Sequence, residues 1–208
     1  AKHCCGYRYR LMNSEPQSSA SKSGQGLQLI REWVTVLVVA LVIAITVRSL
    51  VLQQFYISGP SMETTMFQDN RVLVNKLSYR LHDIYRGDVV VFDRVTVDGE
   101  VVQHDDLIKR VIGLSGETIS IKDCQVFIDG KLLPEPYLND YDLAQSSLDD
   151  RCRVPLMEET LIPENHLFVM GDNRPQSFDS RMFGSIEQHL VVGRAFVTIW
   201  PLAAARFL

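Results

Sequence analysis

The amino-acid sequence predicts a mainly β protein, in which an antiparallel β-sheet domain follows one N-terminal transmembrane helix. Three observations support this fold class. Residues 33–47 form an apolar run of fifteen residues without a charged side chain. After residue 53, short runs rich in Val, Ile and Phe are bounded by Gly, Asp, Asn or Pro, a pattern typical of strands and turns. No further amphipathic helical pattern of about twelve residues is evident, so strands are expected to build the domain.

We divide the chain into a flexible tail at 1–29, a transmembrane anchor at 30–52 and a β-rich domain at 53–208. The tail is rich in Ser and Gly, a composition typical of flexible segments. Twenty helical residues span about 30 Å, the thickness of a bilayer core. A buried core helix would carry a polar stripe, but this run is apolar on every side. A cleaved secretory signal would end in a small-residue cleavage site, but Arg48-Ser49-Leu50 follows here. An uncleaved anchor is therefore favoured.

Flanking positive charges predict the orientation of the anchor. Five Lys or Arg residues precede the apolar run, and only Arg71 occurs in the twenty residues after Leu52. We therefore expect a cytoplasmic N-terminus and a β-rich domain on the opposite, trans side of the membrane. Residues 53–208 hold 15 basic and 23 acidic residues, a net charge of −8. Because nucleic-acid binding requires a positive surface, no nucleic-acid partner is expected.

The domain sequence contains eight strand-like runs and one strong hairpin signal. Asp129-Gly130 stands between apolar flanks, which predicts a tight turn within 125–133. The polar and acidic segment Leu138–Arg153 is expected to form a surface loop. The predicted strands are Gln53–Ile57, Arg71–Asn75, Asp88–Phe92, Leu107–Ile112, Thr118–Ile121, Gln125–Ile128, Leu167–Met170 and Val191–Trp200.

Cysteine and histidine patterns do not predict a metal site. The four cysteines include no C-x-x-C pair, and the five histidines have no ligand spacing. Cys124 and Cys152 both lie in the β-rich domain. They could form a disulfide in an oxidising compartment or remain as two free thiols, and the sequence favours neither alternative.

Two segments of polar, turn-forming composition stand out from the strands. In Ile57–Met66, Ser61 follows Gly59-Pro60, a pair that forces a turn and leaves little side-chain bulk nearby. Taken alone, this serine fits an ordinary linker turn. Met170–Gly184 is dense in Gly, Asp, Asn, Ser and Arg, which predicts an ordered turn that places polar groups.

A third segment places a lysine inside a predicted strand. Strand alternation puts Lys109 on the same face as Leu107 and Val111. A lysine there either reaches a solvated edge or is desolvated, and the sequence leaves both alternatives open. Desolvation would disfavour the ammonium form and lower the pKa of the amine.

Together the three segments resemble the motifs of type I signal peptidase, also called leader peptidase. The nucleophile motif of that family reads S-M, its lysine motif K-R-V-x-G-x-x-G-D/E and its third motif G-D-N-R-x-x-S-x-D-S-R. All three occur here in the family order, with the G-D-V-V-V-F box at Gly87–Phe92 and an anchor just upstream. The resemblance covers roughly residues 30 to 201 and is with the single-span form of the family.

The resemblance implies a membrane-bound serine endopeptidase with a Ser/Lys dyad that removes signal peptides from exported precursor proteins. Ser61 is then the acyl-forming nucleophile and Lys109 its general base, with no metal or cofactor. The implied partners are exported precursors and membrane lipid. The implied location is the plasma membrane or the thylakoid membrane, with the catalytic domain on the trans side.

The resemblance also assigns supporting residues in the third motif and beside the dyad. Ser177 matches a serine that hydrogen-bonds and orients the lysine, and Asp179 and Arg181 match a supporting pair that shapes the site. Asp172 and Arg174 are expected to hold the turn of the third motif. Met62 and Ile108, which flank the reacting residues, are expected to line the substrate pocket.

The chain departs from the family pattern near the nucleophile, where Thr64 and Met66 replace the usual Pro and Leu. Gly59 stands where some members carry a serine that helps to stabilise the oxyanion. The oxyanion hole is therefore expected to rely on backbone N–H groups, including that of Ser61, and each donor contributes about 3 kcal/mol.

One alternative is a catalytically silent, membrane-tethered β-domain that binds a partner. Its signature would be the loss of Ser61 or Lys109, and both are present. Another is a self-cleaving Ser/Lys protease of the kind found in LexA-like repressors. The anchor and the lack of a DNA-binding helical domain argue against it.

Overall fold

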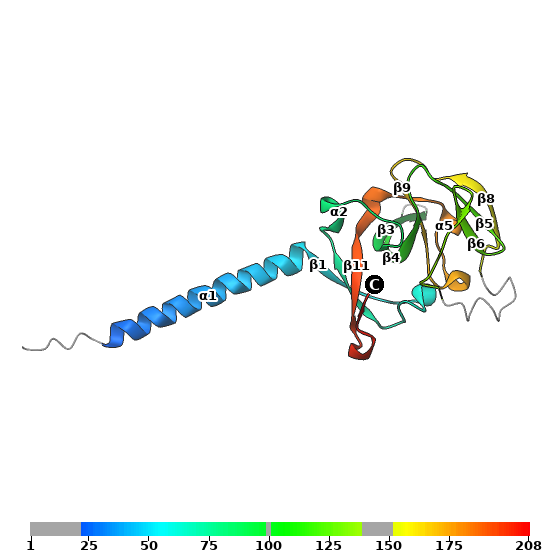
Figure 1. The fold of residues 1–208 in the computed structure, drawn as a ribbon. Coiled ribbons are helices and arrows are strands. Elements are labelled where there is room, and N and C mark those ends of the chain that lie inside the picture. The colour runs from blue at the N-terminus through cyan, green and yellow to red at the C-terminus, as the bar shows by residue number, and fades with distance from the viewer. Residues whose placement is uncertain (1–21, 99–100, 139–151) are drawn as a thin grey trace, which may run out of the picture. The chain divides into compact units, whose positions relative to one another are not determined.

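The computed structural model describes residues 22–98, 101–138 and 152–208. Contacts divide the chain into two compact units, residues 1–44 and 45–208. One helix, α1 (Lys22–Leu50), is the main element of the first unit (Figure 1). Its stretch Gln28–Val47 has 20 residues, a mean hydropathy of 2.2 and no buried part, so it is long and apolar enough to cross a membrane.

The helix begins earlier than the predicted anchor. Residues 22–29, expected to belong to a flexible tail, continue the helix in the N-terminal direction. Helical hydrogen bonds join backbone groups and do not require apolar side chains, so polar residues can extend an apolar helix. Residues 1–21 of the predicted tail lie outside the described residues.

The second unit contains a large antiparallel sheet and a smaller one. All the paired strands in both sheets run antiparallel, which confirms the predicted fold class. The large sheet has the strand order β1 (Leu52–Tyr56), β2 (Arg71–Asn75), β11 (Val191–Trp200), β3 (Val89–Asp98), β4 (Val101–Gly113), β9 (His166–Met170) and β10 (Ile186–Glu187), with β12 (Arg206–Phe207) paired to β11. The smaller sheet has the order β7 (Lys131–Leu132), β6 (Gln125–Ile128), β5 (Thr118–Lys122) and β8 (Leu156–Leu161).

All eight predicted strands are present, and two of them, β3 and β4, extend beyond the prediction by more than one residue. The β3–β4 hairpin continues from Val89↔Arg110 to Asp98↔Val101, well past the apolar run that ends at Phe92. The predicted tight turn joins β6 to β7, and Asp129 and Gly130 both have positive φ, at 48° and 72°. Strands β8, β10 and β12 were not predicted. Of the expected loop Leu138–Arg153, residues 139–151 lie outside the described residues.

A disulfide between Cys124 and Cys152 joins the β5–β6 turn to the segment that precedes β8. The two cysteines are 28 residues apart in the sequence. The sequence left open whether these two cysteines form a disulfide or remain free thiols, and in the structure they form the disulfide.

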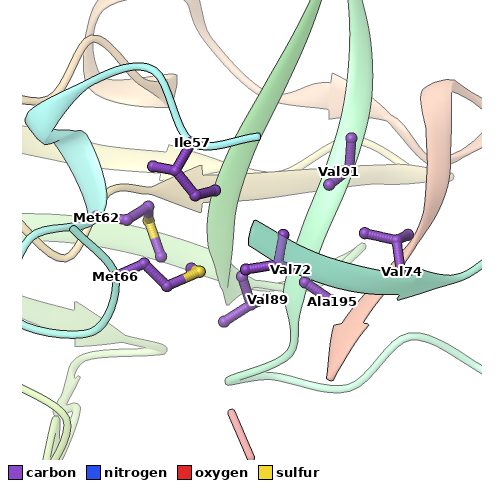
Figure 2. Packing of buried hydrophobic residues seen from close by; sticks show 8 residues of the cluster. All are labelled: Ile57, Met62, Met66, Val72, Val74, Val89, Val91 and Ala195. Atoms are coloured by element: carbon purple, nitrogen blue, oxygen red, sulfur yellow. The ribbon is translucent and has the colours of Figure 1, made fainter. Parts of the chain in front are cut away.

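The hydrophobic core next to the large sheet fixes the segment around Ser61. Met62 and Met66, both without exposed surface, point toward valines of β2 and β3 (Figure 2). Full burial of a methionine stabilises a fold by about 1.5–3 kcal/mol. The other members of this cluster are Ile57, Val72, Val74, Val89, Val91 and Ala195.

Reduction of the Cys124–Cys152 bridge should lower the melting temperature of the protein. A cross-link that closes a loop of this length limits the conformational freedom of the unfolded chain and stabilises the fold by about 3.6 kcal/mol. Thermal unfolding in detergent, with and without reductant, measures this change. The double variant Cys124→Ser/Cys152→Ser should melt at the lower temperature in both conditions. A wild-type protein whose melting temperature stays constant after complete reduction would contradict the prediction.

Candidate active site

Ser61 lies in a short 3-10 helix, η1 (Pro60–Met62), after β1 of the large sheet. Pro60 begins this helix, because its fixed φ suits a first helical position. Met62 holds the turn in the core, while Ser61 is half-buried. The backbone N–H of Ser61 falls in the first helical turn, where no carbonyl within the helix can accept it. One residue therefore offers both a hydroxyl and an available backbone donor.

Lys109 of β4 is the basic side chain that contacts Ser61. Its Nζ lies 2.8 Å from Ser61 Oγ and 2.9 Å from the backbone carbonyl oxygen of Ile108. The lysine pairs with Val90 of β3 in the sheet register and is 3% exposed. The sequence left open whether Lys109 is desolvated or reaches a solvated edge, and in the structure its side chain is desolvated.

Burial controls the ionisation of Lys109. Removal of the amine from water disfavours its charged form and lowers the pKa from 10.5 to about 8. The negative charges of Asp179 and Asp172 act to raise this pKa, and the positive charge of Arg181 acts to lower it. With a pKa of about 8, roughly a tenth of the Lys109 amines are neutral at pH 7, against about one in 3,000 for an ordinary lysine. The neutral amine has the lone pair that a general base needs.

Asp179 and Arg181 form a buried pair in the polar segment Met170–Gly184. Arg181 donates from Nε and Nη2 to the two carboxylate oxygens of Asp179, each at 2.8 Å. Asp179 also accepts from the backbone N–H of Gly171 at 3.0 Å and caps α5 (Ser180–Phe183). Burial raises the pKa of Asp179, but the hydrogen bonds and charge of Arg181 outweigh burial and hold that pKa below its usual value. The carboxylate therefore stays ionised.

Ser177 follows η2 (Arg174–Gln176) and has no exposed surface. Its Oγ lies near enough to Asp179 to help lower the pKa of that carboxyl. Within the described part of the chain, however, no contact of this Oγ satisfies hydrogen-bond geometry. The expected bond to Lys109 is therefore not formed in this structure, and the orienting role of Ser177 stays a prediction.

The segment Met170–Gly184 also fixes the backbone of the turn around Ser61. Asn173 donates from its backbone N–H to the Ser61 carbonyl at 3.1 Å and from Nδ2 to the Pro60 carbonyl at 3.0 Å. Gly171 approaches so closely that an added Cβ would lie 2.3 Å from the Ser61 carbonyl oxygen and 2.3 Å from Ser177 Oγ. Only glycine fits there without a shift of the neighbouring backbone.

Arg110, which sequence analysis missed, joins β4 to the segment Met170–Gly184. It donates to both carboxylate oxygens of Asp172, from Nε at 2.8 Å and Nη2 at 2.6 Å. Thr65 Oγ1, in the turn around Ser61, donates to the same carboxylate at 2.5 Å. A second basic residue directly after Lys109, inside an apolar run, is the sequence signal that could have indicated this ion pair.

Glu135 and Tyr137 were also missed. Glu135 forms a buried, bidentate pair with Arg174, with side chains 10% and 4% exposed. Tyr137 donates its hydroxyl to Glu135 at 2.7 Å, and the Arg110 guanidinium lies 4.1 Å from the centre of its ring. Glu135 and Arg174 are 39 residues apart in the sequence, so no local pattern could have predicted the pair.

The two expected pocket residues occupy different environments. Met62 has no exposed surface and packs inside the core, so it anchors the turn and does not line an open pocket in this structure. Ile108 is only partly buried at the edge of the same cluster. The pocket role therefore stays a prediction for Ile108.

The arrangement brings a serine hydroxyl to a desolvated lysine amine, beside an available backbone donor. A nucleophile in contact with a base is the combination required for acyl transfer. The residues that the structure describes contain no group of three or more His, Cys, Asp or Glu side chains able to hold a metal ion.

Comparisons with known proteins agree with this chemistry. Residues 30–200 match the family described as "Signal peptidase, peptidase S26". "Signal peptidase I V" of Bacillus subtilis is 39% identical over 166 residues, covering 78% of this chain and 95% of that protein. "Signal peptidase I" of Bacillus caldolyticus is 36% identical over 174 residues, covering 81% and 91%. "Probable signal peptidase I-2" of Synechocystis sp. is 34% identical over 168 residues, covering 80% and 71%.

Lys109→Met should be more stable than the wild type at pH 7, by about 3 kcal/mol. In the wild type, a folded-state pKa of about 8 lies below the unfolded value of 10.5, so folding works against a charged amine. Wild-type stability should rise with pH between these two values, and the difference should shrink to near zero above pH 10.5. Urea unfolding of both proteins at several pH values measures it. A difference that is independent of pH would contradict the lowered pKa.

Gly171→Ala should destabilise the protein by about 3 kcal/mol, because the new Cβ would overlap backbone that cannot easily move. Gly59→Ala is the matched control, since Gly59 has an extended φ of 177° and no atom within 4 Å of an added Cβ. Thermal unfolding should show a clear loss for Gly171→Ala and a small change for the control. Equal melting temperatures for the two variants would contradict the close packing at Gly171.

Proposed function

The chain belongs to the signal peptidase family, peptidase S26, and we propose that it is a membrane-bound serine endopeptidase that removes signal peptides from exported precursor proteins. We assign Ser61 as the nucleophile and Lys109 as the general base. The observation that carries this assignment is the 2.8 Å contact between Ser61 Oγ and the buried Nζ of Lys109. In the catalytically silent alternative one of these side chains would be lost, whereas here both are present and in contact.

The first half of the reaction forms an acyl-enzyme. Neutral Lys109 accepts the hydroxyl proton of Ser61 as Oγ attacks the scissile carbonyl carbon, and the carbonyl oxygen becomes an oxyanion. The Lys109 ammonium then donates its proton to the leaving amine, and the C–N bond breaks. The Ile108 carbonyl, 2.9 Å from Nζ, fixes the direction of the amine.

The second half releases the product. Neutral Lys109 removes a proton from water, and the hydroxide attacks the acyl carbon. The ester bond to Ser61 breaks, and the proton returns to Oγ. When Lys109 carries three N–H donors, Ser61 and Ile108 accept two of them. Ser177, whose buried hydroxyl has no well-formed hydrogen bond among the described residues, is proposed to accept the third.

The oxyanion is proposed to bind backbone donors, including the N–H of Ser61. This N–H lies at the start of η1, where no helical carbonyl accepts it. Gly59, with open space around an added Cβ, leaves room for the substrate backbone beside the turn. Each donor of this kind contributes about 3 kcal/mol to transition-state stabilisation.

The proposed placement follows from the apolar helix and the flanking charges. The predicted anchor at 30–52 crosses a plasma or thylakoid membrane in a single pass through α1, which ends at Leu50 before β1 begins. Residues 1–29 then lie on the cytoplasmic side and residues 53–208 on the trans side. Ser61 follows Leu52 by only nine residues, which keeps the nucleophile close to the point where a substrate leaves the bilayer. Membrane lipid is then a constant partner, and the acidic domain disfavours nucleic acid.

Cleavage of a precursor that carries an Ala-x-Ala site tests this function. Wild-type protein in lipid or detergent should cut after the second Ala. Ser61→Ala and Lys109→Ala should each lose at least about 10³-fold in kcat/KM. Ser58→Ala and Lys122→Ala, at exposed positions, are matched controls that should cut at the wild-type rate.

The pH dependence is part of the same experiment. Because Lys109 must be neutral, kcat/KM should fall about tenfold per pH unit below about 8 and level off above it. A flat acid limb, an inactive wild type, or full activity in either dyad variant would each refute the assignment of the dyad.

A further inference from the structure

Backbone hydrogen bonds join the segment after β2 to the end of the apolar helical stretch. The Val51 N–H donates to the Val47 carbonyl at 2.9 Å, and the Lys76 N–H donates to the Val51 carbonyl at 2.9 Å. Val47 is the last residue of the apolar stretch. One helical turn rises about 5.4 Å, and the headgroup layer outside each face of the hydrocarbon core is about 5–8 Å thick. With α1 in a bilayer, Lys76 therefore lies at the level of the lipid headgroups.

Two basic side chains at this level have no ion-pair partner in the part of the chain that the structure describes. Lys76 is half-buried, and Arg80, four residues later in α2 (Ser78–Leu81), is exposed. Within the described residues, neither side chain forms an ion pair, whereas five other arginines of the same unit are paired with carboxylates. Their positive charge is therefore available to an anion from outside the protein.

A cavity beside these two cations has a partly apolar lining. Lys76 and Arg80 contribute its positive charge. Two carboxylates contact other residues of the cavity wall: Glu187 lies 3.0 Å from His189, and Asp88 accepts from the Tyr79 hydroxyl at 3.0 Å. Amphiphiles with an anionic headgroup combine the two chemistries that this lining offers. The apolar side chains of the lining include Val51, Leu77, Val191 and Val192.

The charge of the whole β-rich domain, with Lys76 and Arg80 included, explains why such a site would be useful. Residues 53–208 have a net charge of −8, so an anionic bilayer surface repels most of the domain. Salt screens electrostatic forces beyond about 8–10 Å, so only charges close to the bilayer surface interact with it strongly. The residues beside the helix end lie within this distance. Two unpaired cations there replace repulsion with attraction.

We propose that Lys76 and Arg80 bind the headgroup phosphate of an anionic phospholipid, such as phosphatidylglycerol, in the leaflet next to the β-rich domain. The acyl chains then lie in the bilayer beside α1, and the glycerol region contacts the apolar lining of the cavity. The inference rests on the proposed function for one point, the placement of α1 in a membrane.

Lipid binding to the full-length chain in neutral detergent tests the proposal. Native mass spectrometry should count bound phosphatidylglycerol and phosphatidylcholine at matched concentrations. We expect the wild type to prefer phosphatidylglycerol by about tenfold, and Lys76→Gln/Arg80→Gln to lose this preference. The matched control is Lys122→Gln/Lys131→Gln, which removes the same charge from exposed positions of the smaller sheet and should keep the preference.

Two further measurements distinguish lipid binding from phosphate binding and separate the lipid result from the cleavage result. Inorganic phosphate at equal concentration should not displace the lipid, and if it does, the site binds free phosphate and the proposal is overturned. Retention of the lipid preference in Lys76→Gln/Arg80→Gln also overturns it. Ser61→Ala should bind lipid like the wild type, so a failed cleavage assay leaves the lipid result interpretable. Conversely, normal cleavage without a lipid preference refutes only this inference.

Discussion

The structure depends on the burial of one amine. Lys109 is 3% exposed, and its Nζ forms hydrogen bonds to Ser61 Oγ and to the backbone carbonyl of Ile108. Desolvation moves its pKa toward neutrality. Three surrounding features preserve that burial. Met62 and Met66 anchor the turn around Ser61 in the core, and Gly171 packs closely against this turn. Strand β4 lies inside the large sheet, with a neighbouring strand on each side. A gap at any of these contacts would admit water and restore the charged lysine.

The charges near Lys109 are arranged so that they do not cancel the effect of burial. Asp172 and Asp179 both act to raise the pKa of Lys109. Each carboxylate, however, is paired with an arginine, Asp172 with Arg110 and Asp179 with Arg181. A paired carboxylate presents a weaker field to a third charge than an isolated one. The buried pairs therefore supply rigid hydrogen-bonded support to the site, and the lysine still reaches a lowered pKa.

Sequence reasoning predicted what local patterns encode and missed what distant contacts decide. Runs of Val, Ile and Phe indicated eight strands, and Asp129-Gly130 indicated its hairpin because both residues tolerate positive φ. The extension of β3 beyond Phe92 was missed because its side chains are mostly polar, and β10 and β12, of two residues each, are too short for a period. The motifs indicated Ser61 and Lys109. The partners of the motif arginines were not predictable, because Glu135 pairs with Arg174 across 39 residues.

The adjacent residues Ser61 and Met62 explain how a reactive turn stays stable. Ser61 directs its hydroxyl to Lys109, and Met62 directs its whole side chain into the core. The desolvated lysine costs about 3 kcal/mol at neutral pH, a large share of the 5–15 kcal/mol by which a domain is normally stable. Three kinds of contact compensate for this cost: the methionine core, the arginine–carboxylate pairs and the Cys124–Cys152 bridge. None of these contacts uses the hydroxyl of Ser61, which receives a hydrogen bond from Lys109, so they supply stability without engaging the proposed nucleophile.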